Sequence, residues 1–133
     1  MTDSESHAKG KEILRRLRVG QAPGGASPVT GEMFFDLVEN RLNFADFWRM
    51  TQEHLFGEVW SRPGLALRDR SMVTMVALTV LARTEELKGH VGYALNVGIT
   101  KAEILEMIMH VAHYAGWPVA VNALRAAKEV FKG

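Results

Sequence analysis

The sequence predicts an all-α protein, and three features of the 133-residue chain support this prediction. Apolar residues recur three and four positions apart through most of the chain, which is the spacing of one face of an α-helix. Residues that start and end helices stand between these stretches. No stretch alternates apolar and polar residues, as a half-buried strand does. The length suits one domain, a bundle of about six to seven helices.

The N-terminal part is predicted to hold one helix and one loop. A basic amphipathic helix is expected over residues 9–18, with Ile13, Leu14 and Leu17 on its apolar side. The stretch from Val19 to Pro28 (VGQAPGGASP) consists largely of turn-forming residues. We interpret this stretch as a mobile connection between the helix and the main body.

We therefore divide the chain into an N-terminal helix with a flexible Gly/Pro loop, residues 1–30, and a helical domain, residues 31–133. Asn43 is expected to cap the first helix of that domain, with Asp46 three residues later in its first turn. The segment Ser61–Gly64 (SRPG) ends this helix, because proline and glycine interrupt helical hydrogen bonding.

Four further helices are expected, over about residues 67–81, 84–96, 100–116 and 118–131. Thr84 is expected to cap the second of them, and Thr100 with Glu103 forms a capping box for the third. Gly98 and Gly116 are placed as helix stops. The first of the four is apolar on nearly every face. It is therefore predicted to be central, or to have one side covered by another subunit.

Charge and hydropathy exclude several classes of partner. The 16 Lys and Arg residues almost balance 15 Asp and Glu residues, with a net charge of +1. No strongly basic footprint for nucleic acid or an anionic membrane is present, so neither is expected as a partner. Residues 107–124 carry no formal charge, but Pro118 divides them into two buried helices. Residues 1–10 are polar and lack a secretory signal, which favours the cytoplasm.

The chain contains no cysteine. Disulfides, thiolate zinc sites, iron–sulfur clusters and thiol redox chemistry are therefore excluded. The sequence also lacks the Gly-x-Gly-x-x-Gly fingerprint, the Walker loop and the Gly-x-Ser-x-Gly elbow. We expect no cofactor.

Two candidate groups lie on helix faces. Glu86 and His90 stand four residues apart, so they share one face of their helix. They form either an acid/base pair at the rim of a pocket or an exposed pair of small energetic weight. Arg70 opens the apolar helix and serves either as a structural clamp or as the ligand of an anionic substrate.

A second row of side chains lies along one line of the following helix. Its members, spaced by three and four, are Glu103, Glu106, His110, His113 and Trp117. A metal site is disfavoured, because no second cluster supplies ligands and the His-Glu-x-x-His arrangement is absent. The row forms either a pocket wall, joined by Tyr114, or a half-buried face against a neighbouring helix or subunit.

The order of short motifs is more specific. The chain resembles the carboxymuconolactone decarboxylase family in FGEVWSRPGL at 56–65, RDRS at 68–71, EELKGH at 85–90, ALNVGIT at 94–100, YAGWP at 114–118 and NAL at 122–124. This resemblance runs from about Phe44 to Phe131. It implies the all-helical fold of the alkylhydroperoxidase D proteins and a homo-oligomer, a hexamer or trimer.

The resemblance also separates two chemistries. Relatives with peroxidase activity use a Glu-x11-Cys-x2-Cys-x3-His pattern, whose places are filled here by Ser71, Arg83, Glu86 and His90. Because both thiols are missing, a thiol peroxidase is excluded. The chain is similar to the branch that converts 4-carboxymuconolactone to 3-oxoadipate enol-lactone and carbon dioxide, in the breakdown of aromatic acids through protocatechuate.

This branch implies roles for the candidate residues. Glu86 and His90 are the expected catalytic residues of a cofactor-independent carboxy-lyase with a small-molecule substrate. The expected substrate-binding residues are Arg70, Ser71, His110, Tyr114 and Trp117. Two alternatives stay open, the first because His113 and the N-terminal forty residues depart from the family pattern, and the second because the balanced charge and the apolar helices also suit it. One is a same-pocket enzyme for another small acid or lactone, acting by cyclisation, isomerisation or decarboxylation. The other is a non-catalytic ligand-binding oligomer.

Overall fold

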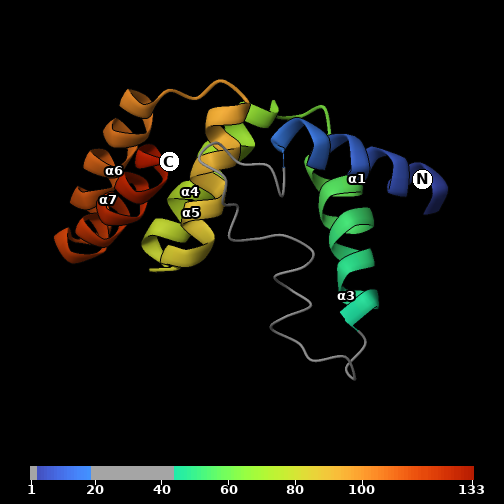
Figure 1. Cartoon of the computed structure of the whole chain (residues 1–133), viewed down its shortest axis with the longest axis horizontal. Coiled ribbons are helices and arrows are strands. Elements are labelled where there is room, and N and C mark those ends of the chain that lie inside the picture. The colour runs from blue at the N-terminus through green and yellow to red at the C-terminus, as the bar shows by residue number, and fades with distance from the viewer. Residues whose placement is uncertain (1–2, 19–43) are drawn as a thin grey trace.

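The structure is a computed structural model that describes residues 3–18 and 44–133 (Figure 1). All regular elements in these two ranges are helices, so the prediction of an all-α fold is confirmed. The mobile connection proposed for Val19–Pro28, the division near residue 30 and the cap at Asn43 lie outside the described residues.

Helix α1 spans Asp3–Leu17 and begins six residues before the predicted start at residue 9. Helix α3 (Phe44–Met50) continues directly into η1 (Thr51–Trp60), a helix with the wider turns of the π type. Figure 1 shows α1 lying across the end of η1. These helices form one arm of the molecule.

Two glycines bring the backbones of α1 and η1 into contact. A Cβ atom at Gly10 would lie 1.9 Å from the carbonyl oxygen of Gln52, and one at Gly57 would lie 2.1 Å from the carbonyl oxygen of Ser6. Both distances are far below van der Waals contact, so only glycine allows this crossing.

The other arm is a four-helix bundle, formed by α4 (Leu67–Val80), α5 (Thr84–Asn96), α6 (Lys101–Ala115) and α7 (Trp117–Lys132). The capping box of Thr100 and Glu103 is present as predicted. Gly98 and Gly116 end their helices with φ of 95° and 108°, a region that favours glycine. The predicted cap at Thr84 is wrong. Thr84 is the first helical residue, and Arg83 occupies the cap position without a side-chain hydrogen bond.

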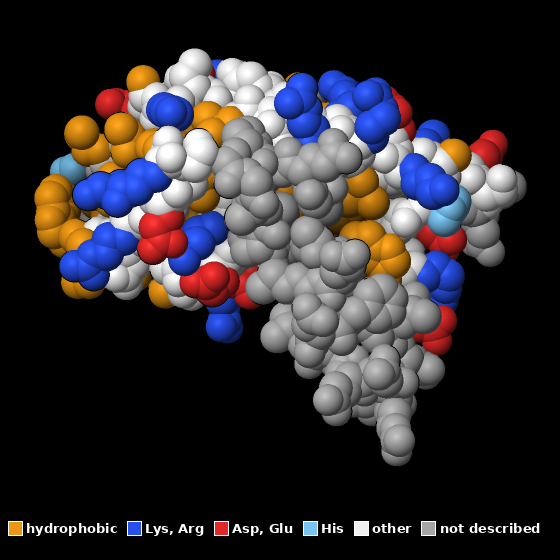
Figure 2. Space-filling model, in the orientation of Figure 1, with side chains coloured by type: hydrophobic (Ala, Val, Ile, Leu, Met, Phe, Trp, Pro, Cys, Tyr) orange, Lys and Arg blue, Asp and Glu red, His pale blue; other side chains and the backbone are white. Residues whose placement is uncertain are grey.

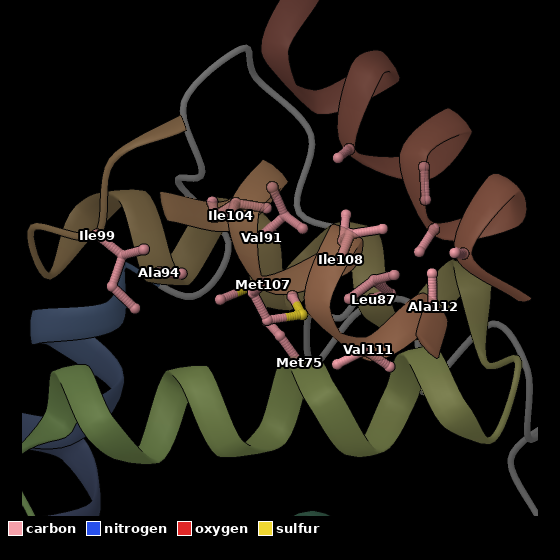
Figure 3. Close-up of a cluster of buried hydrophobic side chains, with 14 residues drawn as sticks. Met75, Leu87, Val91, Ala94, Ile99, Ile104, Met107, Ile108, Val111 and Ala112 are labelled. Carbon is pink, nitrogen blue, oxygen red and sulfur yellow. The ribbon is translucent and has the colours of Figure 1, made fainter. Parts of the chain in front are cut away.

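Two apolar clusters form the core, and the smaller one joins the two arms. The larger cluster fills the bundle, where Met75 of α4, Leu87 and Val91 of α5 and Ile108 of α6 are buried with alanines of α7 (Figure 3). The smaller cluster joins α1 and η1 to the start of α4 and to α5; it contains Ile13, Leu17, Phe56, Trp60, Leu67 and Tyr93. Burial of these side chains fixes α5 as the helix that both arms share.

Parts of the bundle surface are apolar. Val73 on α4 is 61% exposed, and Val80 near its end is also exposed, so α4 is not covered on all sides within one chain. Hydrophobic side chains also gather over α6 and α7, at the left edge of Figure 2. Among the described residues, no helix combines the length and apolar character that a membrane crossing requires.

Candidate active site

Helices α4 and α5 place three of the predicted site residues on neighbouring elements. Arg70 and Ser71 lie in the first turns of α4, and His90 lies at the middle of α5. The short turn Leu81–Arg83 makes the two helices antiparallel neighbours. Residues that are nineteen or twenty positions apart in sequence therefore come onto adjacent helices.

His90 is enclosed by aromatic rings. Its ring centroid lies 6.1 Å from that of Trp60 on η1, with the planes tilted by 33°, and 5.2 Å from that of Tyr93, which meets it edge-on. Nδ1 of His90 is buried and has no hydrogen-bond partner among the described residues. The apolar surroundings disfavour the charged imidazolium, so burial lowers the pKa of His90 from 6.5 to about 4.

This environment defines what His90 can do near neutral pH. The imidazole is uncharged there, so one ring nitrogen carries a hydrogen and the other accepts a hydrogen bond. An uncharged imidazole in a site of low polarity can donate a hydrogen bond to an oxygen that gains negative charge.

Arg70 and Ser71 add two more buried polar atoms. Nη2 of Arg70 donates a hydrogen bond to the carbonyl oxygen of Arg62, 3.1 Å away, which orients the guanidinium group. Its Nε atom and the Oγ atom of Ser71 are buried without a partner among the described residues. A buried polar atom without a partner costs about 1–3 kcal/mol. A bound ligand that reached these atoms and Nδ1 of His90 would satisfy them.

Glu86 lies one turn before His90 on α5 and is exposed. Among the described residues, no hydrogen bond joins its carboxylate to the His90 ring. The predicted pair therefore shares a helix face, with the imidazole enclosed and the carboxylate facing solvent.

His110, Tyr114 and Trp117 lie elsewhere in the bundle, at the end of α6 and the start of α7. The His110 and Tyr114 rings are 5.1 Å apart, and the His113 ring meets Trp117 edge-on at 6.0 Å. Tyr114 is 82% exposed and Trp117 is 64% exposed. Within one chain these side chains form an exposed aromatic cluster, and no ring contact joins them to His90 in the described part.

Trp60 and Tyr93 both contact His90, although no sequence motif assigned either of them a role in the site. Tyr93 stands three residues after His90, so helical spacing could have found it. Trp60 comes from η1, and nothing in the spacing pointed to it. The described residues include no group of three His, Asp or Glu side chains that could hold a metal ion.

Comparison with known proteins gives concordant matches. The chain matches the model of the carboxymuconolactone decarboxylase family over residues 45–129. It is 44% identical to a 4-carboxymuconolactone decarboxylase of Acinetobacter baylyi over 134 aligned positions, which cover 99% of this chain and 91% of that protein. It is 37% identical to a nitrosuccinic acid decarboxylase of Metarhizium robertsii over 94 positions, covering 67% of this chain and 66% of that protein.

Proposed function

The chain belongs to the carboxymuconolactone decarboxylase family, and on this premise we propose that it is a carboxy-lyase that converts 4-carboxymuconolactone to 3-oxoadipate enol-lactone and carbon dioxide. The observation that carries this proposal is the 44% identity to the Acinetobacter enzyme over nearly the whole chain. The buried polar atoms of Arg70, Ser71 and His90 support it from the structure.

The chemistry proposed for this site needs no cofactor. The bond between the ring carbon and the leaving carboxylate breaks, and its electron pair moves through the ring double bond into the lactone carbonyl oxygen. The dienolate that results is protonated on a ring carbon. The protein must therefore stabilise charge on one oxygen, remove water from the leaving carboxylate and deliver one proton.

We assign to His90 the stabilisation of the negative charge on the lactone carbonyl oxygen. A pKa of about 4 keeps its imidazole uncharged at neutral pH. It is then a hydrogen-bond donor that is fixed by two aromatic rings, and it does not need to reorganise as the charge develops. Glu86, one turn away on the solvent side, would share the proton that reaches the ring carbon.

We assign binding of the carboxylate that stays on the substrate to Arg70 and Ser71. The Arg62 carbonyl orients the guanidinium of Arg70, whose Nε–H has no partner in the described part of the chain. The hydroxyl of Ser71, the next residue in the sequence, is buried. Charge-assisted hydrogen bonds of this kind are stronger than neutral ones. Together they would hold the substrate while its other carboxylate leaves.

The exposed apolar surface supports a homo-oligomer, which the family resemblance expects to be a hexamer or trimer. A second subunit would cover the apolar faces of α4, α6 and α7. His110, Tyr114 and Trp117 would then join the substrate site from a neighbouring subunit. The place of the reaction in aromatic-acid breakdown and the cytoplasmic location stay predictions.

The decisive experiment mixes purified protein with 4-carboxymuconolactone and follows release of carbon dioxide. His90→Ala should abolish turnover, while His54→Ala, which removes an exposed imidazole of η1, should leave it near the wild-type rate. Absence of turnover by folded wild-type protein would refute the proposed substrate.

The Metarhizium relative motivates a second candidate, decarboxylation of a different small acid. Nitrosuccinic acid is a direct probe of this alternative. Faster release of carbon dioxide from it than from the lactone would favour the alternative, provided that His90→Ala still abolishes the reaction.

A further inference from the structure

An arginine-lined pocket lies away from the His90 site, where the C-terminal end of α1 meets the start of α4 and the end of α5. It has a volume of about 570 Å³, and its charged lining consists of Arg15, Arg16, Arg18 and Arg68. Figure 2 shows Lys and Arg side chains gathered over α1. The net charge of the chain gives no indication of such a concentration.

Only two of these four guanidinium groups have partners among the described residues. Arg15 forms two hydrogen bonds to Glu12, at 2.6 and 2.9 Å, and Arg68 is paired with Glu103. The guanidinium groups of Arg16 and Arg18 are exposed and form no hydrogen bond or ion pair in the described part, although Arg15 and, to a smaller extent, Arg16 lie near enough to Glu12 to lower the pKa of that carboxyl. As far as the described residues go, the pocket thus offers two guanidinium groups to an anion.

The backbone adds further donors. Helix α4 begins at Leu67, and its cap residue is Ala66, whose side chain cannot accept the first amide hydrogens of the helix. Both residues line the pocket. The positive end of the α4 dipole thus faces the same space as the arginines.

The walls of the pocket are held in place. Nδ2 of Asn96 donates a hydrogen bond to the carbonyl oxygen of Leu17, 2.8 Å away, which ties the end of α5 to the end of α1. Leu67 and Val97 present apolar surface beside the arginines. A ligand that fits should therefore combine several negative groups with a short carbon skeleton.

We propose that this pocket is a binding site for a small organic polycarboxylate. Two carboxylates would engage Arg16 and Arg18, a third acceptor would face the start of α4, and the carbon skeleton would lie against Leu67 and Val97. The pocket is distinct from the proposed catalytic site, because none of Arg70, Ser71 and His90 lines it.

Citrate is the probe, and acetate at matched ionic strength is its control. Citrate at about ten times its Kd should raise the thermal unfolding midpoint of the full-length protein by about 5 °C, in a saturable way. Acetate should not. Isothermal titration calorimetry with the same ligand gives the Kd directly.

The double variant Arg16→Gln/Arg18→Gln should weaken citrate binding at least about tenfold. Both side chains are exposed, so the variant should fold normally. Arg125→Gln, which removes an exposed arginine of α7, is the matched control and should bind citrate as the wild type does. Equal binding by the double variant and the wild type would overturn the proposal.

Two further measurements test where citrate binds and which anions the pocket prefers. Citrate should stabilise His90→Ala as much as the wild type, whether or not the protein is a decarboxylase; loss of the effect would place citrate at the His90 site and overturn the proposal. Inorganic phosphate that stabilises as strongly as citrate, through the same arginines, would overturn the assignment to an organic ligand.

Discussion

Enclosure of His90 makes the stability of this protein depend on pH in a defined window. Burial lowers the pKa of the folded imidazole to about 4, whereas the unfolded chain has the ordinary value of 6.5. Between these two values the unfolded state binds a proton that the folded state does not. Stability should therefore fall as the pH is lowered from 6.5 to 4, and this group adds no further change below that range.

The size of the effect follows from the shift. A difference between 6.5 and about 4, at about 1.4 kcal/mol per unit, corresponds to at most about 3.5 kcal/mol of folding free energy. His90 as a residue is half-buried although its Nδ1 atom is buried, so solvent reduces this amount. A loss of about 2–3 kcal/mol between pH 7 and pH 4 is the expected contribution.

Urea unfolding at a series of pH values measures this contribution, at one protein concentration because an oligomer is expected. His90→Gln removes the titrating group, so its stability should fall less steeply with decreasing pH than that of the wild type. Parallel curves for wild type and His90→Gln, or an NMR titration of His90 near pH 6.5, would refute the reasoning.

Three further changes test the fold. Gly10→Ala should separate α1 from η1, because its Cβ would lie 1.9 Å from the Gln52 carbonyl oxygen. Urea unfolding should show a loss of roughly 2–4 kcal/mol in the free energy of unfolding. Gly64→Ala is the control and should be neutral, because a Cβ at Gly64 meets no atom within 4 Å. Thr100→Ala removes one half of the capping box and should cost about 1 kcal/mol, again by urea unfolding. Ile108→Ala leaves a cavity in the bundle core and should cost about 2–5 kcal/mol, seen as a lower thermal midpoint. Stability equal to wild type in any of the three would contradict the feature that the variant tests: the crossing of α1 and η1, the cap of α6 or the packing of the bundle core.

Helix ends were predicted correctly where interactions between residues close in sequence determine them. The capping box at Thr100 and the glycine stops at Gly98 and Gly116 involve residues within a few positions of one another, and all are present in the structure. Prediction failed at Thr84, because a threonine before a helical stretch can occupy the first helical position as well as the cap. The start of α1 was missed because residues 3–7 are all polar and show no apolar period.

The sequence alone determined the all-α class, the family and the exclusion of thiol chemistry, because these depend on composition and on motifs that are contiguous in the chain. Tertiary structure decided the environment of each side chain. It placed Trp60 against His90, separated the aromatic cluster at Tyr114 from that ring within one chain, and collected arginines from α1 and α4 around one pocket. Burial and pKa depend on contacts between distant segments, which no spacing within a single helix can specify.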